Sequence, residues 1–198
     1  MRKRNKFQRV QLPRSFGLNT ENSILVRGHF ALENHEFIKA RNKFSVRTFY
    51  ADDRSDFGQN KTAPHFCTIT KSMLMKKAPD CFKQGLQLIV ADQIDSKDCK
   101  FCGTIWISDK ITVEIANGPG TVRRVTNEGK IDARYDISHS ELFGDGCLDL
   151  CISECKKTRL RDVIFEFSYY NILIGCKNER FICWEITDDG TGKNRLFR

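Results

Sequence analysis

The sequence predicts an α+β protein in which antiparallel strands and a few helices alternate along the chain. In several short segments apolar residues recur at every second position, which is the pattern of a strand with one buried face. Other segments carry apolar residues at helical spacing, and one stretch is almost continuously apolar. The alternating segments are residues 44–50, 104–107, 111–115, 161–169 and 180–187.

The first part of the chain contains two predicted strands and two predicted helices. Residues 24–28 form a short apolar segment that ends at a glycine, and residues 44–50 alternate as a strand. Residues 30–42 have helical spacing and basic side chains near their end, where cations suit the helix dipole. Residues 71–85 also have helical character, and we expect this helix to break at Pro79, because a proline ring does not fit a helix interior.

A central strand and a hairpin follow. Residues 86–94 form the nearly continuous apolar run, which is typical of a strand in the middle of a sheet. Residues 104–107 and 111–115 are separated by a polar turn, so we expect them to form an antiparallel hairpin.

In the last third of the chain, the sequence predicts one further strand, one helix and a second pair of strands. A strand is expected within the polar segment 126–138, and residues 148–157 have the pattern of an amphipathic helix. Residues 163–169 and 181–187 share the alternation of the first hairpin, so we expect them to pair as well.

Length and charge indicate the class of protein. The 198 residues carry a formal net charge of +8 and are long enough for one large domain or two lobes. No apolar run approaches the roughly 20 residues of a membrane helix, and no hydrophobic segment follows the basic start. We therefore expect a cytoplasmic protein without a membrane partner.

The excess of positive charge begins in an N-terminal arm, residues 1–20. Its basic side chains have no acidic counterpart within the first fourteen residues, and we interpret the arm as solvated, with phosphate groups as an alternative partner. Beyond it acidic and basic residues are mixed, so a nucleic-acid partner is not expected. The basic residues are Arg2, Lys3, Arg4, Lys6, Arg9 and Arg14.

The nine cysteines are interpreted as reduced, buried thiols. Cys99 and Cys102 have the spacing of a metal or redox pair, and zinc is the alternative for them. A structural zinc site needs further ligands, whereas Cys147, Cys151 and Cys155 recur at the spacing of one helix face.

A glycine-rich loop follows the first hairpin and leads into two arginines. Gly118 and Gly120 flank a proline, and Arg123 and Arg124 come shortly after. Glycine lets backbone N–H groups approach an anion, and guanidinium groups can clamp it. The alternative is an ordinary turn with surface arginines.

Two glutamates on the last pair of predicted strands are candidate metal ligands. Glu166 and Glu185 each lie between apolar residues, so each side chain is expected to point to the face of its strand opposite to those neighbours. If the strands pair, the two carboxylates can converge on one Mg²⁺, a cation that prefers oxygen ligands. A solvent-facing sheet is the alternative. The alternation leaves open whether Arg47 points inward or outward, and Glu114 could face a cleft or solvent.

Taken in order, these segments resemble the ATP-grasp nucleotide-binding domain of phosphoenolpyruvate synthase and pyruvate phosphate dikinase. Residues 45–48, with Asp52 and Asp53 beyond them, are similar to that family's Val-Arg-Ser-Ser segment. Residues 89–95 resemble its hinge strand, and residues 111–120 its Ile-x-Glu-x-x-x-Gly-Leu-Gly segment. Residues 162–166 and 184–185 resemble two later strands. The phosphate-binding lysine of the first lobe has no clear match, and the family's final Gln-Ala-Arg-Pro is absent.

The resemblance implies an ATP-grasp-like fold with antiparallel sheets and flanking helices in two lobes, 21–85 and 86–198. It implies binding of ATP and Mg²⁺ between the lobes, with phosphoryl transfer or carboxylate activation on an unknown acceptor, as a transferase or ligase. A protein that keeps the fold without turnover is the alternative, and a partner protein or domain is possible. The implied catalytic residues are Arg47 and Arg123, and the implied metal ligands are Glu166 and Glu185. The implied nucleotide-binding residues are Arg47, Asp92, Ile94, Glu114, Gly118, Gly120 and Arg123.

Overall fold

The computed structural model describes residues 4–50, 63–107, 110–120, 122–137, 163–170 and 180–187. The chain divides into two compact units, each with its own sheet. The four-stranded unit comprises residues 5–7 and 21–94, and the five-stranded unit comprises residues 1–4, 8–20 and 95–198. The predicted lobe boundary between residues 85 and 86 lies nine residues before the division between residues 94 and 95, because the strand that begins at Leu86 pairs within the first sheet.

The four-stranded sheet has the order β1-β4-β2-β3, and every pair in it is antiparallel. Its strands are β1 (Ser23–Val26), β2 (Lys43–Tyr50), β3 (His65–Thr70) and β4 (Leu86–Asp92). The sequence reading missed β3, a short strand that lies just before a helix.

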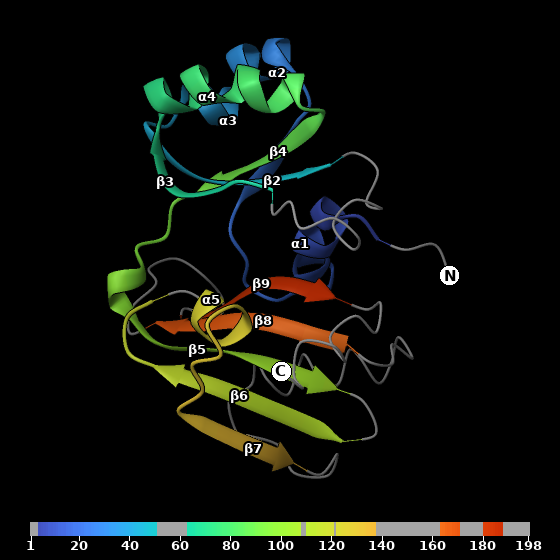
Figure 1. Ribbon diagram of the computed structural model, residues 1–198, viewed down its shortest axis with the longest axis vertical. Coiled ribbons are helices and arrows are strands. Elements are labelled where there is room, and N and C mark those ends of the chain that lie inside the picture. Colours follow the sequence, from blue (N-terminus) through green and yellow to red (C-terminus); the bar gives the residue numbers. More distant parts are fainter. Residues whose placement is uncertain are drawn as a thin grey trace. The chain divides into compact units, whose positions relative to one another are not determined.

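One face of this sheet is covered by α2 (His29–Asn34), α3 (Glu36–Lys39) and α4 (Lys71–Lys83), as Figure 1 shows. Leu74 and Ala78 of α4 are buried against Val46 and Leu88 of the sheet in one hydrophobic core. Full burial of a side chain such as Leu74 contributes about 1.5–3 kcal/mol. The opposite face carries the alternate residues of each strand, Arg47 among them.

Two helix predictions in this unit are wrong in detail. The helix expected over residues 30–42 is interrupted at His35, whose extended backbone ends α2 while its ring Nδ1 accepts a hydrogen bond from Phe37 N and caps α3. The helix α4 continues through Pro79 rather than breaking there. Its buried face continues past the proline to Cys81, so packing outweighs the lost backbone hydrogen bond.

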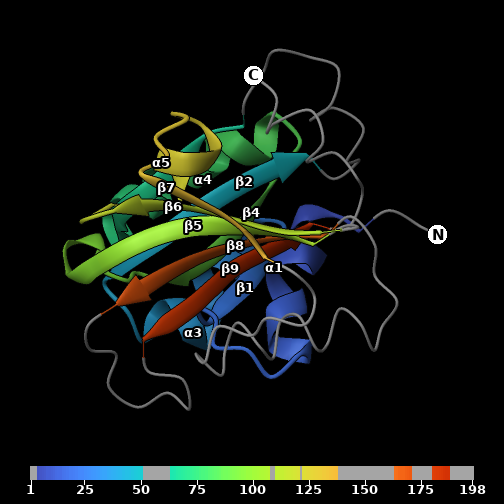
Figure 2. The same ribbon diagram turned by 90° about the horizontal axis from the view of Figure 1, so that it is seen from below.

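The five-stranded sheet has the order β7-β6-β5-β8-β9 and is also antiparallel throughout (Figure 2). The strands are β5 (Cys99–Ile107), β6 (Ile111–Asn117), β7 (Ala133–Ile137), β8 (Val163–Tyr170) and β9 (Phe181–Thr187). The pairing of β5 with β6 and of β8 with β9 confirms both predicted hairpin-like pairs. The fold is therefore α+β, as predicted.

Short helical segments complete this unit. A 3₁₀ turn, η2 (Ser96–Asp98), precedes β5, and α5 (Arg123–Thr126) follows the glycine-rich loop. The predicted solvated arm is wrong for residues 6–15, which form α1 (Lys6–Ser15) beside β9. Arg9, Val10 and Pro13 of this helix are buried.

Several sequence predictions lie outside the described residues. They are the helix at 148–157 with Cys147, Cys151 and Cys155, and the acidic residues Asp52 and Asp53. Within the described part of the chain, no helix is long and apolar enough to cross a membrane.

Candidate functional site

A row of polar side chains crosses the five-stranded sheet at a single level. In the register, Glu114 of β6 lies opposite both Arg134 of β7 and Thr104 of β5. Thr104 in turn lies opposite Glu166 of β8, and Glu166 lies opposite Glu185 of β9. We call these five residues, Arg134, Glu114, Thr104, Glu166 and Glu185, the polar row.

The polar row occupies the face of the sheet opposite to its hydrophobic core. Ile105, Val113 and Phe165, which are neighbours of row members along their strands, are fully buried in the core cluster. Because successive side chains of a strand point to opposite faces, the row members share the other face. Opposed residues on adjacent antiparallel strands have Cβ atoms about 4.5–5.5 Å apart, so adjacent row members can touch one ligand.

Glu114 is a buried carboxyl group with an incomplete set of partners. Its residue is 2% exposed, and Arg134 Nη1 lies 3.5 Å from its Oε1. Among the described residues its Oε2 has no hydrogen-bond partner. Burial raises the pKa of Glu114, and Arg134 opposes this effect in part while Asp136 adds to it. Glu114 is therefore biased toward the protonated form, which can donate a hydrogen bond as well as accept one.

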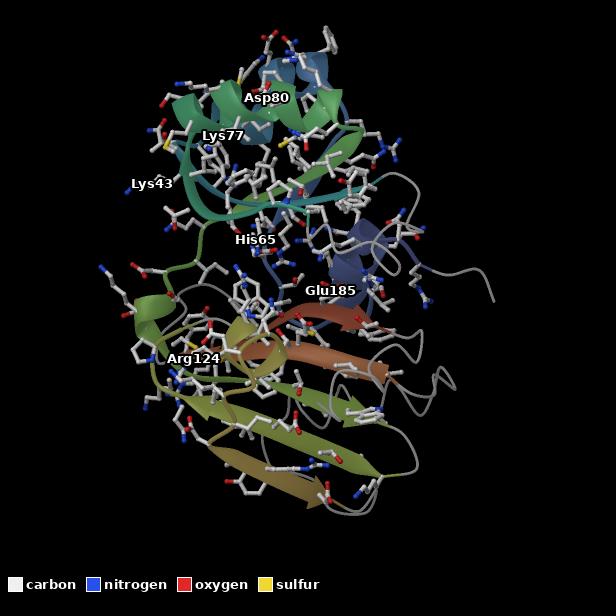
Figure 3. All side chains as sticks on the ribbon, in the orientation of Figure 1. Lys43, His65, Lys77, Asp80, Arg124 and Glu185 are labelled. Atoms are coloured by element: carbon white, nitrogen blue, oxygen red, sulfur yellow. The ribbon has the colours of Figure 1, made fainter. Side chains whose placement is uncertain are left out.

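Glu185 is held by a residue that the sequence reading assigned to the solvated arm. Arg9 Nε of α1 donates to Glu185 Oε1 at 2.8 Å, and both side chains are about nine-tenths buried. Figure 3 labels Glu185 on β9. A β-bulge lies next to this position, between Glu166 and Phe167 in the register with β9. Trp184, the residue that the bulge adds, donates its indole N–H to Ser168 Oγ at 2.8 Å.

The donor set at the end of the polar row fits a hard divalent cation. Glu166 and Glu185 supply carboxylate oxygens from directly opposed positions, whereas like charges placed in this way destabilise a sheet unless a cation lies near them. Arg9 neutralises one of the two. The described residues contain no group of three or more His, Cys, Asp or Glu that could hold a metal. Two carboxylates suit Mg²⁺, which binds few protein ligands and takes the remainder from water and phosphate.

Three groups of the glycine-rich loop and its flank that were expected to bind an anion donate hydrogen bonds to backbone carbonyls of the protein. Gly118 N–H donates to Lys100 O at 2.6 Å, and Gly120 N–H donates to Ser96 O at 3.3 Å. Arg124 Nη1 donates to the carbonyl oxygens of Gly118 and Pro119, each at 3.3 Å. The two amides are thus bonded to β5 and to η2, and Arg124 is bonded to the loop itself. Figure 3 labels Arg124 on α5.

Arg123 differs from its neighbour, because its side chain is exposed at the start of α5. Of the two arginines, the structure uses Arg124 to hold the loop and presents Arg123 to solvent. The role of Arg123 as a phosphate ligand stays a prediction.

Arg47 forms a buried ion pair inside the four-stranded unit. Its Nη2 lies 2.7 Å from Glu21 Oε1, and the Glu21 side chain is fully buried. On β2, Arg47 lies opposite Ile89 of β4 and His65 of β3, on the face that the helices leave open. If Arg47 binds a phosphate, its guanidinium therefore has to contact both the phosphate and Glu21.

The hinge-strand candidates lie at the end of β4. Asp92 accepts a hydrogen bond from Asn22 Nδ2 at 3.0 Å and another from Arg41 Nε. Its backbone N–H donates to Asn22 O at 2.9 Å, which ties the end of β4 to the residue before β1. Ile94 follows the strand and is half-buried.

Cys99 and Cys102 both lie on β5, and their buried thiols are not joined in a disulfide. Burial raises the pKa of both, to about 11 for Cys102, so the thiolate that binds metal is disfavoured. Cys99 Sγ donates to Phe101 O at 3.2 Å and Cys102 Sγ to Ala116 O at 3.8 Å. These contacts are those of packed core thiols.

Sequence reasoning found three of the five row members and missed Thr104, Arg134 and the row's partner Arg9. Thr104 follows the same alternation as Trp106, so its face could have been assigned once β5 was placed. Nothing in the sequence indicated the roles of Arg134 and Arg9, because Arg134 belongs to a segment predicted only as polar with one strand and Arg9 to the arm predicted as solvated.

Comparison with known proteins identifies solved structures of similar fold. No family model matches the sequence, and no curated protein sequence matches it. Solved structures do match. The macrocyclase MdnC from Microcystis aeruginosa MRC, bound with precursor peptide MdnA, is 13% identical with a TM-score of 0.54, over 92% of this chain and 51% of that one.

Two further structures agree with this match. The ATP-grasp ligase PsnB, complexed with a minimal precursor, is 11% identical with a TM-score of 0.50, over 98% of this chain and 55% of that one. The D-alanine–D-alanine ligase from Bacillus anthracis, complexed with ATP, is 10% identical with a TM-score of 0.52, over 93% of this chain and 54% of that one. The chain thus has the ATP-grasp fold and spans about half the length of these proteins.

Proposed function

We propose that the chain is the nucleotide-binding part of an ATP-dependent ligase, which activates a carboxylate for attack by an unidentified acceptor. The observation that carries the proposal is the polar row, whose carboxylates Glu166 and Glu185 lie opposite each other on β8 and the edge strand β9 of a sheet of ATP-grasp type. Ligation is favoured over the phosphoryl transfer of phosphoenolpyruvate synthase because the similar structures are ligases and a macrocyclase.

The residues have separate roles in this proposal. Glu166 and Glu185 hold Mg²⁺, and Arg47 and Arg123 contact the phosphates as the catalytic cations. Asp92, Ile94 and Glu114 contact the nucleoside, and Gly118 and Gly120 shape the loop beside it. ATP supplies the phosphoryl group that activates the carboxylate, and Mg²⁺ offsets the charge of the phosphates.

The chain's own contribution is to fix these groups in advance. The β-sheet register sets the spacing of the two carboxylates, and the buried ion pair with Glu21 sets the direction of Arg47. Preorganised charges stabilise a charged transition state without reorganising during the reaction. A partner protein or domain could supply the remaining parts of the site and the acceptor, and a cytoplasmic location stays a prediction.

Nucleotide binding tests the proposal directly. Isothermal titration of the chain with ATP, in MgCl₂ and in EDTA, should give binding that is tighter with the metal. Glu166→Gln should weaken the binding in MgCl₂, whereas Glu33→Gln, at an exposed position of α2, should leave it unchanged. Equal weak binding of ATP by all three proteins in both buffers would contradict the proposal.

A second candidate is a protein that keeps the fold without turnover. The observation that favours it is the ion pair of Arg9 with Glu185, because the charge of the guanidinium reduces the need for a metal ion at that carboxylate. This candidate predicts that ATP binds equally well in EDTA and that no ADP forms with any acceptor.

A further inference from the structure

Arg9 contacts Glu185, one of the two proposed metal ligands, although Arg9 itself is not a proposed ligand. The distance from Arg9 Nε to Glu185 Oε1 is 2.8 Å, and the two side chains are 8% and 10% exposed. An ion pair this well buried interacts far more strongly than one on the surface, because little water screens it.

The position of Arg9 is set by the packing of its helix. Val10 and Pro13 of α1 are buried, and Leu12 and Phe16 pack against the hydrophobic core beneath the five-stranded sheet. The helix is therefore anchored by apolar contacts in the turns that follow Arg9. The guanidinium is held at Glu185 by the fold and does not depend on the ion pair alone for its place.

A divalent cation and Arg9 would use the same carboxylate. The guanidinium occupies Oε1 of Glu185, and its positive charge repels a second cation at close range. From this contact, and resting on the proposed function, we propose that Arg9 is an internal counter-ion of Glu185 that competes with the divalent cation and lowers the metal affinity of the Glu166–Glu185 pair.

The competition has two consequences. In the absence of metal, Arg9 keeps Glu185 neutralised, so the two opposed carboxylates do not destabilise the sheet. In the presence of metal bound to nucleotide phosphates, the cation must displace Arg9 from Oε1 or bind through Oε2 beside it. Free metal should therefore bind weakly, and metal that arrives with a nucleotide should bind better.

The test measures binding of MnCl₂ alone, by the electron paramagnetic resonance signal of free Mn²⁺, in the parent chain and in Arg9→Gln. Glutamine keeps an N–H donor but removes the charge. We expect Mn²⁺ to bind about tenfold more tightly to Arg9→Gln than to the parent, a gain that Arg9→Lys should not show. Arg14→Gln, on the exposed side of the same helix, is the matched control and should bind as the parent does.

Thermal unfolding with and without MnCl₂ covers the case in which Arg9→Gln folds poorly. A ligand that binds the folded state raises Tm, so Mn²⁺ should stabilise Arg9→Gln more than the parent. If Mn²⁺ neither binds more tightly nor restores stability, Arg9 is a structural contact and the inference is wrong.

A further variant separates this inference from the proposed function. Adding Glu185→Gln to Arg9→Gln should abolish the gain in Mn²⁺ affinity. If Glu185→Gln weakens ATP binding in MgCl₂ while Arg9→Gln leaves Mn²⁺ affinity unchanged, the proposed function stands and the inference fails. If no variant binds Mn²⁺ and the parent does not bind ATP, both fail.

Discussion

Glu166 and Glu185 lie directly opposite each other on β8 and β9, at the last regular pair before a β-bulge. Like charges in this position repel, and a sheet stabilised by packing alone would gain from replacing one of them. Bulges recur beside functional sites, where they redirect a side chain or end a run of pairing. Together, the opposed carboxylates and the adjacent bulge favour a binding role for this end of the sheet.

The first prediction concerns these two carboxylates. Glu166→Gln and Glu185→Gln each remove a charge with little change of shape. Glu185→Gln also leaves the buried guanidinium of Arg9 without its carboxylate, so it should be the less stable of the two, and its titration is run well below its Tm. Each should lower the affinity for ATP in MgCl₂ by about tenfold and change it much less in EDTA. Calorimetric titration of both single variants and of the double variant measures the effect.

The double variant provides the decisive comparison. If the two glutamates hold one ion, either substitution alone spoils the site, and the double variant should bind little worse than the single ones. Strictly additive losses would indicate two independent contacts. Parent-like binding by both single variants would show that the carboxylates do not take part.

The second prediction concerns the ion pair of Arg47 with Glu21. Arg47→Met leaves the fully buried carboxylate of Glu21 without this cation and should lower the free energy of unfolding by about 3–5 kcal/mol. Arg47→Lys keeps the charge and should cost less. Urea unfolding, monitored by circular dichroism, measures the difference.

The control for Arg47 is an exposed ion pair in the same unit. Lys83 Nζ lies 3.9 Å from Asp80 Oδ1 with both side chains largely exposed, so Lys83→Met should change stability by less than about 1 kcal/mol. If Arg47→Met retains full stability but loses ATP affinity, Arg47 acts on the nucleotide alone.

The third prediction concerns Gly103, in the middle of β5. A Cβ at this position would lie 2.1 Å from Glu114 O and 3.0 Å from Phe167 Cζ, so the backbone of the neighbouring strand would have to move. Gly103→Ala should therefore destabilise the five-stranded unit by about 1–3 kcal/mol or more. Gly28→Ala, where nothing lies within 4 Å and the backbone is extended, is the control and should be tolerated. Equal melting temperatures for the two variants would contradict this packing.

The strand pairs were predictable because their signal is local. Residues such as Phe167 and Ile186 alternate with polar neighbours, and this pattern alone indicates which face is buried. The register then follows from the need to keep both apolar faces on one side of the sheet. The opposition of Glu166 and Glu185 is a consequence of that register, so half of the candidate site could be inferred from the sequence.

The contacts of Arg9 and Arg134 could not be inferred in the same way. Each depends on a pairing between distant parts of the chain, and a basic residue in a polar segment looks the same whether it is solvated or bound to a buried glutamate. At Pro79 a local rule predicted a helix break, but tertiary packing of α4 overrides it. In both examples, contacts between residues distant in sequence determine the structure.

The last prediction uses the buried carboxyl group of Glu114. Burial raises its pKa above the ordinary value of 4.5 that it has in the unfolded chain. Between these two pKa values the folded state binds more protons than the unfolded state, so the contribution of Glu114 to stability falls as pH rises through this window and is constant above it. The pKa of Asp136, which also faces Glu114, is lowered by its hydrogen bonds with Lys110 and Thr112, so Asp136 stays ionised through this window.

Glu114→Gln removes this titration and keeps the shape of the side chain. Near pH 4.5 the variant and the parent should have similar Tm values, and the variant should become the more stable of the two as pH rises to 8. Glu128→Gln, at an exposed position after α5, should show no such trend. Thermal unfolding across this range measures the difference. If the Tm of the parent instead rises relative to that of Glu114→Gln as pH increases, the fold stabilises the ionised carboxylate. The attraction of Arg134, 3.5 Å from Glu114, then outweighs the cost of burial.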